Sequence, residues 1–416
     1  MALELRKLSI KRYKGYSEQT DLELAPLTIL VGANNSGKTA LAQVIQLLAG
    51  GFDPVDRKAS EPLPLESGGL RHGEVFRDLV TGQNVHGHLS LSASFADSRG
   101  ELSISTTVSN VVLPDNRSVR QISDWQLKSG DEEIKVKRQG YESQAKYSVS
   151  SQRENHELQS IDWQGLLPRE PSNLADWVGM RVNDIKVWAA GVRHLCCPRS
   201  LIQQPLNASK STPVPFSSDG TFASLTLATD DKLKESVRKW YRDTFGASVE
   251  VETQGKYSEL MVGTQHSSGM VQLMQSGQGL SHVLPVVVMA LTANKEGVGV
   301  DVIEHPEAEL HPAAHGQVAD LLLNNLVGVA RPMVIETHSE MMLLRARRWI
   351  AEEKLSAKDV LIYWIDKESD HGSTVRKITI NQTGDLDSWP EGVFIESYEE
   401  ILAIRRAIRR RTELRG

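Results

Sequence analysis

The sequence contains little cysteine and no long apolar run. Its two cysteines, Cys196 and Cys197, are adjacent, so they cannot provide a disulfide framework or a four-ligand zinc site, and a reducing cytoplasm is the expected compartment. The longest apolar stretch, residues 283–293, is shorter than the roughly 20 residues of a membrane span. Charged residues interrupt the first 16 positions, so no signal peptide is predicted. We therefore expect no membrane attachment.

The sequence also lacks a strong excess of charge of one sign. It has 47 basic and 53 acidic residues and a net charge of −6. This excludes a generally basic protein of the histone kind, although a local basic patch for nucleic acid stays compatible with it. The 416 residues are enough for two or three lobes, or for one large domain with an insertion. With 40% hydrophobic and 24% charged residues, the composition is that of a globular protein.

One segment fits the phosphate-binding pattern G-x-x-x-x-G-K-[ST], known as the P-loop. In this pattern backbone N–H groups surround the β-phosphate of a nucleotide, Lys38 bridges the β- and γ-phosphates, and the hydroxyl of Thr39 is a ligand of Mg²⁺. The apolar run 27–31 predicts a strand before the segment, and residues 40–49 predict a helix after it that stops at Gly50-Gly51. The predicted ATP-binding residues are Gly32, Ala33, Asn34, Asn35, Ser36, Gly37, Lys38, Thr39 and Ala40.

Three further segments follow the P-loop. A Ser-Gly turn within residues 275–282 opens an apolar helix, residues 300–304 predict a strand that ends in Glu304, and residues 333–337 predict another strand, which His338 follows. Free N–H groups at the start of a helix suit an anion such as a γ-phosphate. Each segment alone also fits a turn, a buried strand or a surface histidine. In this order, together with the P-loop, they indicate one class of nucleotide-binding protein.

The ordered segments resemble the ATPase head of ABC-type proteins, in the branch that contains RecF, the SMC proteins and the overcoming-lysogenisation-defect ATPases. More narrowly, the block from Glu304 to Pro312 and the Glu-Thr-His-Ser segment at 336–339 are similar to those of stand-alone bacterial ATPases of phage-defence systems. The resemblance covers nearly the whole chain. It implies an α/β P-loop NTPase fold, namely an ABC-type ATPase head with an antiparallel β subdomain and an inserted lobe that bears the signature.

The resemblance also implies roles for individual residues. Thr39 and Glu304 would hold Mg²⁺, His338 would sense the γ-phosphate, and residues 192–199 would lead into the Q-loop, whose glutamine is Gln203 or Gln204. Two chains would enclose two ATP molecules, with the signature of one chain against the P-loop of the other. The predicted signature residues are Ser276, Gly277, Gln278 and Gly279.

One position departs from the family pattern. In most ABC ATPases a glutamate follows the Walker B carboxylate, here Glu304, and acts as general base for the attacking water; this chain has His305 instead. A neutral imidazole, with a reference pKa of about 6.5, can accept a proton at pH 7 but lacks the negative charge of a carboxylate. Glu307 is the alternative base, and His305 would then only pack. The predicted catalytic residues are His305, Glu307 and His338, and slow hydrolysis is expected rather than fast.

The predicted organisation has four parts. Residues 1–199 form the P-loop lobe with the β subdomain, 200–282 the signature-bearing lobe, 283–395 the Walker B and switch-histidine half of the P-loop lobe, and 396–416 a basic C-terminal helix. Alternating apolar and polar residues predict antiparallel strands, and two longer runs predict helices. The strands are expected at 89–95, 102–108 and 133–139, and the helices at 173–191 and 231–245.

The residues after His338 favour an effector on a separate protein. Overcoming-lysogenisation-defect proteins continue into a nuclease domain, whereas 78 residues follow His338 here, and their acidic cluster, Asp366–Asp370, is predicted to form a hairpin turn. The favoured function is an ATP-gated switch or scaffold that forms a homo-oligomer and works with a separately encoded effector, a nuclease or toxin, in phage defence. A RecF-like clamp that binds DNA directly is the alternative. A transporter ATPase is disfavoured, because the Leu-Ser-Gly-Gly-Gln signature and the Asp-Glu Walker B pair are absent.

Overall fold

The computed structural model describes most of the chain. The described residues are 3–53, 61–112, 118–140, 145–151, 155–200, 214–254, 257–264, 269–292, 298–327, 331–368, 372–389 and 404. Two predictions fall elsewhere: the Q-loop glutamine at Gln203 or Gln204, and the basic helix 396–416 apart from Ile404, lie outside the described residues.

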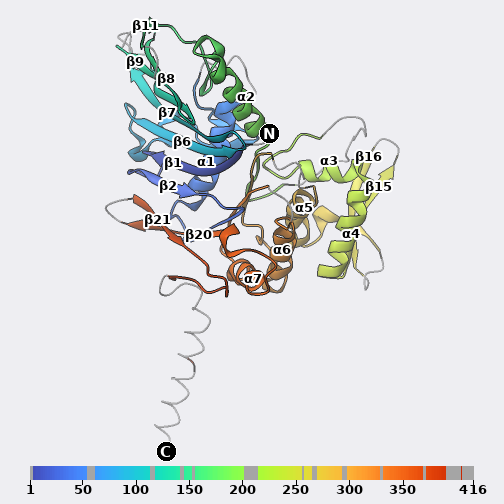
Figure 1. Cartoon of the computed structure of the whole chain (residues 1–416). Coiled ribbons are helices and arrows are strands. Elements are labelled where there is room, and N and C mark those ends of the chain that lie inside the picture. The colour runs from blue at the N-terminus through green and yellow to red at the C-terminus, as the bar shows by residue number, and fades with distance from the viewer. Residues whose placement is uncertain are drawn as a thin grey trace, which may run out of the picture.

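A six-stranded sheet forms the centre of the molecule, with the order β14-β18-β19-β3-β20-β21 (Figure 1). Neighbouring strands are parallel except for β20 and β21, which form an antiparallel pair. β3, β18 and β19 are buried along their whole length, as expected of parallel strands that are covered on both faces. The bounds are β3 (Leu27–Gly32), β14 (Arg193–Leu195), β18 (Asp301–Glu304), β19 (Met333–Glu336), β20 (Val360–Glu368) and β21 (Gly372–Ile378).

β19 lies between the P-loop strand β3 and the Walker B strand β18. Its register pairs Glu336 with Glu304 on one side and with Leu30 on the other. The carboxyl ends of three strands therefore meet at one edge of the sheet. In open parallel sheets ligands bind at this edge, so the topology already selects where a site can form.

A second sheet of eight antiparallel strands forms a lobe beside the first, in the order β11-β10-β9-β8-β7-β6-β1-β2 (Figure 1). Along β6 buried and half-buried residues alternate, so one face packs on a core and the other faces solvent. Trp188 of α2 packs against Phe95 of β6 and Phe52 of α1, with ring centroids 5.0 and 6.3 Å apart. The bounds are β1 (Glu4–Lys11), β2 (Thr20–Glu23), β6 (His88–Asp97), β7 (Gly100–Val112), β8 (Ser118–Ser129), β9 (Glu132–Gln139), β10 (Lys146–Ser151), β11 (Asn155–Gln159), α1 (Lys38–Phe52) and α2 (Asp176–Ala190).

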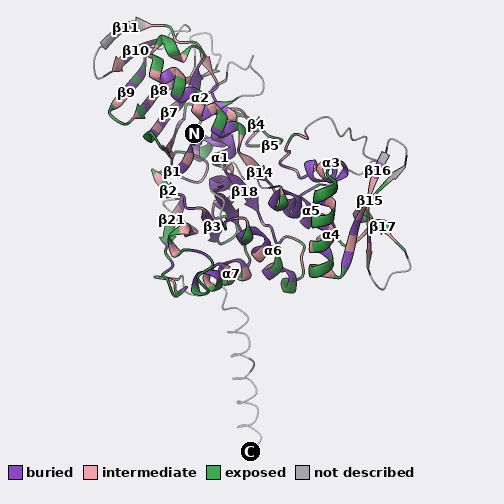
Figure 2. Ribbon diagram, turned by 45° about the vertical axis from the view of Figure 1, so that its right-hand side comes forward, coloured by how far each residue is buried: buried purple, intermediate pink, exposed green. Residues whose placement is uncertain are grey.

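The remaining helices pack around a second core on the other side of the central sheet. α4 buries Leu233, Val237 and Tyr241, four residues apart, while its outward face is exposed (Figure 2), as an amphipathic helix requires. The hydroxyl of Tyr241 donates to the carbonyl of Leu280 over 2.7 Å and so joins α4 to α5. The bounds are α3 (Phe222–Thr229), α4 (Asp231–Phe245), β15 (Ala247–Gln254), β16 (Tyr257–Thr264), β17 (Val271–Gln272), α5 (Gln278–Leu291), α6 (Pro312–Asn324) and α7 (Glu340–Ala351).

Several predictions about the fold are confirmed. The chain is an α/β protein with an antiparallel β subdomain, and the helix expected at 231–245 is α4. The acidic cluster 366–370 belongs to a hairpin, since β20 and β21 pair Glu368 with Gly372, although residues 369–371 at its tip are not described. Among the described residues, no helix is both long and apolar enough to cross a membrane.

The predicted end of the first helix was wrong. α1 continues through Gly50-Gly51 to Phe52. A side chain at Gly50 would overlap Ser67, and one at Gly51 would meet Leu166 at 2.8 Å. These glycines allow close packing against the helix and do not end it. The domain boundary drawn after residue 282 falls inside α5, so the helix that follows the signature is one continuous element.

Candidate functional site

The P-loop connects β3 to α1, which begins at Lys38. Gly37 has a φ of 107°, a conformation that side chains rarely adopt. A methyl group at Gly37 would lie 2.7 Å from the hydroxyl of Ser373 and 2.9 Å from that of Tyr16. The Tyr16 hydroxyl donates to the carbonyl of Gly37 over 3.0 Å. The loop is thus braced by the turn after β1 and by the β20–β21 hairpin.

The P-loop side chains are arranged to receive an anion. The buried Nζ of Lys38 donates to the carbonyls of Gly32 and Ala33, over 3.1 and 2.7 Å. Burial lowers the pKa of Lys38, and the nearby carboxylate of Glu336 opposes this effect. The hydroxyl of Ser36 is buried without a hydrogen-bond partner among the described residues. A cation that binds only its own loop, next to an unpartnered hydroxyl, fits a site for the phosphates of a nucleotide.

Thr39, the predicted Mg²⁺ ligand, faces Glu336 rather than Glu304. Its hydroxyl donates to Oε1 of Glu336 over 2.7 Å, while Oε2 of Glu336 is buried and has no partner in the described part of the chain. Burial raises the pKa of Glu336, although Thr39 and His305 partly offset the rise. The sequence analysis gave Glu336 no role. Its place at the end of the strand between β3 and β18 is visible only once the strand order is known.

Glu304 is held by residues from three other segments. Its Oε1 binds Nε2 of His194 at 2.9 Å and accepts from the amide of Gln43 at 3.3 Å, and its Oε2 accepts from the backbone N–H of Cys197 at 3.1 Å. Burial alone would raise the pKa of Glu304, but His194 and the other donors lower it below its usual value. Glu304 is therefore an ionised, oriented carboxylate, as a group that positions Mg²⁺ needs to be.

Lys14 is a second cation at the site that the sequence analysis missed. It lies in the turn after β1, where its Nζ donates to Oε1 of Gln43 over 3.2 Å. Gln43 in turn binds Glu304. Burial lowers the pKa of Lys14, against the opposing effect of Glu304. No motif indicated Lys14, because it lies near the site only through the fold, which brings the turn after β1 against α1.

The three predicted catalytic residues lie together. The ring of His305 stacks on that of His338, with centroids 5.0 Å apart and planes 4° from parallel. Nδ1 of His305 is 3.9 Å from Oε1 of Glu307, and its Nε2 is 3.5 Å from Oε1 of Glu336. The same Glu307 oxygen accepts the backbone N–H of His338 over 2.9 Å. Glu336 thus joins the predicted group of His305, Glu307 and His338.

The two stacked histidines have opposite protonation preferences. Burial would lower the pKa of His305, but the carboxylates of Glu307, Glu336 and Glu304 outweigh it and raise the pKa above its ordinary value. Burial lowers the pKa of His338, and so do the charges of Lys38 and His305. The opposite shifts mean that His305 takes up a proton before His338 does as the pH falls. Because its pKa is raised, a smaller fraction of His305 than of a free imidazole is in the proton-accepting form at neutral pH.

The predicted signature lies in the second lobe and opens helix α5. Gly277 precedes the first helical residue, and Ser276 donates its hydroxyl to the carbonyl of Leu273 over 2.6 Å. Gly279 packs closely on the carbonyl of Glu309, which a side chain would approach to 2.7 Å. No hydrogen bond or ion pair within the described ranges joins these residues to the P-loop.

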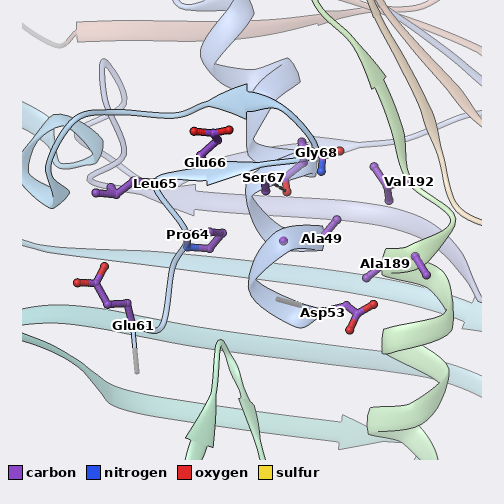
Figure 3. Close-up of a pocket in the computed structure, with 13 residues that line it drawn as sticks. Ala49, Asp53, Glu61, Pro64, Leu65, Glu66, Ser67, Gly68, Ala189 and Val192 are labelled. Carbon is purple, nitrogen blue, oxygen red and sulfur yellow. Dashed lines mark hydrogen bonds between the residues drawn. The ribbon is translucent and has the colours of Figure 1, made fainter. Parts of the chain in front are cut away.

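A separate cavity of about 540 Å³ lies at the other end of α1 from the P-loop (Figure 3). Its walls come from the last turns of α1 and α2 and from residues 61–68. Figure 3 shows Asp53, Glu61 and Glu66 around small apolar side chains. It shares no residue with the group around Lys38 and His305, and it is not part of the candidate site.

Comparisons with known proteins agree with this geometry. Residues 3–159 match the family model described as an AAA ATPase domain. No curated protein matches the chain.

Among solved structures, an SMC head bound to the C-winged helix domain of ScpA is 13% identical to the chain, with a TM-score of 0.51; the match covers 90% of this chain and 98% of that one. The SMC head domain from Thermotoga maritima is 12% identical, with a TM-score of 0.41, and covers 91% of this chain and 100% of its own. An SMC head from Pyrococcus furiosus with an extended coiled coil, bound to the C-terminal domain of ScpA, is 12% identical, with a TM-score of 0.47 and coverages of 97% and 100%.

At 13% identity and a TM-score of 0.51, the likeness to the SMC head bound to ScpA shows the fold alone. The match to the SMC head bound to ScpA extends over most of both chains, so it includes the central sheet as well as the β subdomain. The chain is an α/β P-loop protein with the fold of an SMC head, and its residues 3–159 match an AAA ATPase domain.

Proposed function

We propose that the protein binds ATP with Mg²⁺, forms a dimer around the nucleotide, and hydrolyses it slowly. The observation that supports this most strongly is the meeting of six groups at one sheet edge: the Lys38 amine, the Thr39 hydroxyl, the carboxylates of Glu304 and Glu336, and the stacked rings of His305 and His338. They come from the start of α1 and from the ends of β18 and β19 with the residues that directly follow these strands.

Each group has a defined role in the proposed reaction. Lys38 and the N–H groups of the P-loop would hold the β- and γ-phosphates, and Thr39 with Glu304 would hold Mg²⁺, which supplies charge compensation to the phosphates when bound. His305 accepts a proton from the attacking water, because its ring lies in front of Glu336 and Glu307, which stabilise the charged imidazole. His338 stays neutral beside it and orients the reacting group.

We propose that the signature acts on a second copy of the chain. Ser276 and Gly277 are half-buried and exposed, at the free end of a helix whose first N–H groups have no intrahelical acceptor. A phosphate of the partner's nucleotide satisfies these donors, so each closed dimer contains two ATP molecules. The four-part division is kept as part of this proposal with the boundaries at 199 and 395, and the boundary at 282 moves to the end of α5, so that this helix belongs as a whole to the signature lobe.

The role in the cell rests on motif resemblance alone. The block from Glu304 to Pro312 and the segment 336–339 resemble those of stand-alone ATPases of phage-defence systems. We propose accordingly that the ATP-bound dimer is a switch for a separately encoded effector, a nuclease or toxin. Phage protection should then require a co-encoded protein, and pure protein should not cut DNA or RNA. Full protection by this gene alone, or DNA binding that depends on ATP but on no partner, would favour the DNA-clamp alternative.

Two variants test the ATP-dependent dimer. Lys38→Ala should abolish binding of a fluorescent ATP analogue while the circular dichroism spectrum is unchanged, because the buried amine that meets the phosphates is lost. Ser276→Arg should leave ATP binding intact and keep the protein monomeric in light scattering with ATP and Mg²⁺, because the added side chain blocks closure. A parent protein that stays monomeric under all ATP and Mg²⁺ conditions would disprove the dimer.

A further inference from the structure

Arg199 is a buried cation without an ion-pair partner among the described residues. Only 4% of its surface is exposed. Its Nη2 donates to two backbone carbonyls, those of Glu304 and of His305, the latter over 2.9 Å. Its Nε and Nη1 are buried and have no partner in the described part of the chain. Burial lowers the pKa of Arg199, and the carboxylates of Glu307 and Glu304 partly offset this effect.

The backbone that Arg199 holds is itself strained. His305 has a φ of 43°, a left-handed conformation that residues with a side chain adopt only when their surroundings impose it. Two contacts impose it here. The N–H of His305 donates to the carbonyl of Glu336 over 2.7 Å on one side, and Arg199 binds its carbonyl on the other. Held at both ends, the residue presents its ring to His338.

Arg199 also belongs to a segment tied to the signature lobe. Its neighbours Cys196 and Ser200 donate backbone N–H groups to the carbonyls of Ser218 and Asp219, over 2.9 and 2.7 Å. Residues 218 and 219 lie four and three residues before α3, the first helix of that lobe. The segment is thus bonded to the signature lobe on one side and to the Walker B turn on the other.

We propose that Arg199 is a positioning residue of the hydrolytic site: its guanidinium fixes the turn at Glu304–His305 and so sets the ring of His305 beside that of His338. It acts through backbone carbonyls and is not itself a catalytic residue. Because it is bonded through its neighbours to the signature lobe, it transmits movement of that lobe to His305. The inference rests on the proposed ATPase function and adds to it a link between closure and hydrolysis.

The test separates binding from hydrolysis. Arg199→Met keeps the length of the side chain and removes the donors, and Arg199→Lys keeps the charge but loses the planar pair of N–H groups. Both variants should bind the fluorescent ATP analogue within about twofold of the parent, because the P-loop is untouched. Single-turnover hydrolysis should slow by about 10²-fold, the effect expected when a reacting group moves by about 1 Å. In Arg199→Ala, guanidinium ion at millimolar concentration should restore part of the rate.

Arg331→Lys is the matched control. Arg331 is equally buried, donates to the carbonyls of Gly191 and Val298, and binds Asp301 at the opposite end of β18. Its substitution should lower the melting temperature and leave the single-turnover rate of the folded protein unchanged. An equal loss of rate in Arg199→Lys and Arg331→Lys would mean that any buried arginine of this core has the same effect. That result would overturn a specific role of Arg199.

A second readout does not depend on hydrolysis. In the parent, the NMR resonances of His305 and His338 should show ring-current shifts from their stacking, which Arg199→Met should remove. Unchanged imidazole resonances in a folded Arg199→Met or Arg199→Lys protein would overturn the inference, whatever the rate. A parent that binds no ATP would instead disprove the proposed function, and the resonances would still decide whether Arg199 positions His305.

Discussion

Replacing His305 by glutamate tests the chemistry of the site most directly. His305→Glu puts the usual ABC-type base beside the attacking water, and the general-base contribution of about 10²–10⁴ sets the scale. We expect the lower end, about a 10²-fold faster hydrolysis, because the imidazole already accepts protons to some extent. The rate should be measured under single-turnover conditions with radiolabelled ATP and protein in excess, so that product release does not limit it.

The structure adds a penalty to this substitution. The new carboxylate would stand near Oε1 of Glu336, which lies 3.5 Å from Nε2 of His305. Two unit negative charges at that separation repel by about 5 kcal/mol at an effective dielectric constant of 20. Most of this repulsion is relieved when the two carboxylates share a proton or bind Mg²⁺. Without Mg²⁺ the variant should therefore be less stable than the parent by about 1–2 kcal/mol in urea unfolding.

A double variant isolates that repulsion. Glu336→Gln in the His305→Glu background removes one of the two charges, so the free energy of unfolding lost in His305→Glu should be regained. The cycle of single and double variants then measures the coupling energy between the two carboxylates. Glu307→Gln is the control for the base itself. If His305→Glu leaves the rate unchanged while Glu307→Gln abolishes hydrolysis, the base is Glu307 and the assignment of His305 is wrong.

Two smaller predictions concern the same edge of the sheet. Hydrolysis should rise with pH between 6 and 9, because the base form of His305 appears only above its raised pKa, and His305→Glu should remove this rise; a flat profile in the parent would contradict the assignment. Tyr16→Phe removes the hydrogen bond to the Gly37 carbonyl, worth about 1 kcal/mol, so ATP affinity in calorimetry should fall about 5-fold, and an unchanged affinity would show that the P-loop needs no brace.

Local patterns were sufficient for the elements that contain the predicted site. The strand before the P-loop and the strands that end at Glu304 and Glu336 lie close to their predicted bounds, and the helix after the P-loop exists but extends past its predicted end. Each of these is short, buried and uninterrupted, so its residue types alone indicate it. The match to an SMC head agrees with the overall arrangement, and the roles assigned to the individual site residues stay predictions.

β8 was not predicted, and its register explains why. Its buried residues Ile122, Trp125 and Leu127 are spaced by three and then two positions, since the pairing with β7 shifts between Thr107 and Val108. Such a bulge breaks the period of two on which strand prediction depends. This strand of 12 residues therefore lacks the alternating pattern by which a strand is recognised in a sequence.

The partners of the predicted residues could not be read from the sequence. Glu336, Lys14 and Arg199 reach the site from positions far apart in the chain, and their contacts depend on strand order and register. Thr39 illustrates the limit: its motif fixed its presence at the site, but only the fold shows that its hydroxyl binds Glu336 rather than Glu304. The motif therefore identified the residue, whereas the strand order and register identify its hydrogen-bond partner.

The position of β3 in the central sheet has a consequence for synthesis of the protein. β3 lies between β19 and β20, so the strand that leads into the P-loop has no neighbour in its sheet until residues 333–336 and 360–368 have been made. At about 5–20 residues per second, roughly 15 to 60 s separate the P-loop from β19 on the ribosome. During that time the nascent chain contains the full P-loop motif but neither Glu336, which accepts the hydrogen bond from Thr39, nor His338, so the group of side chains at the ends of β3, β18 and β19 is still incomplete.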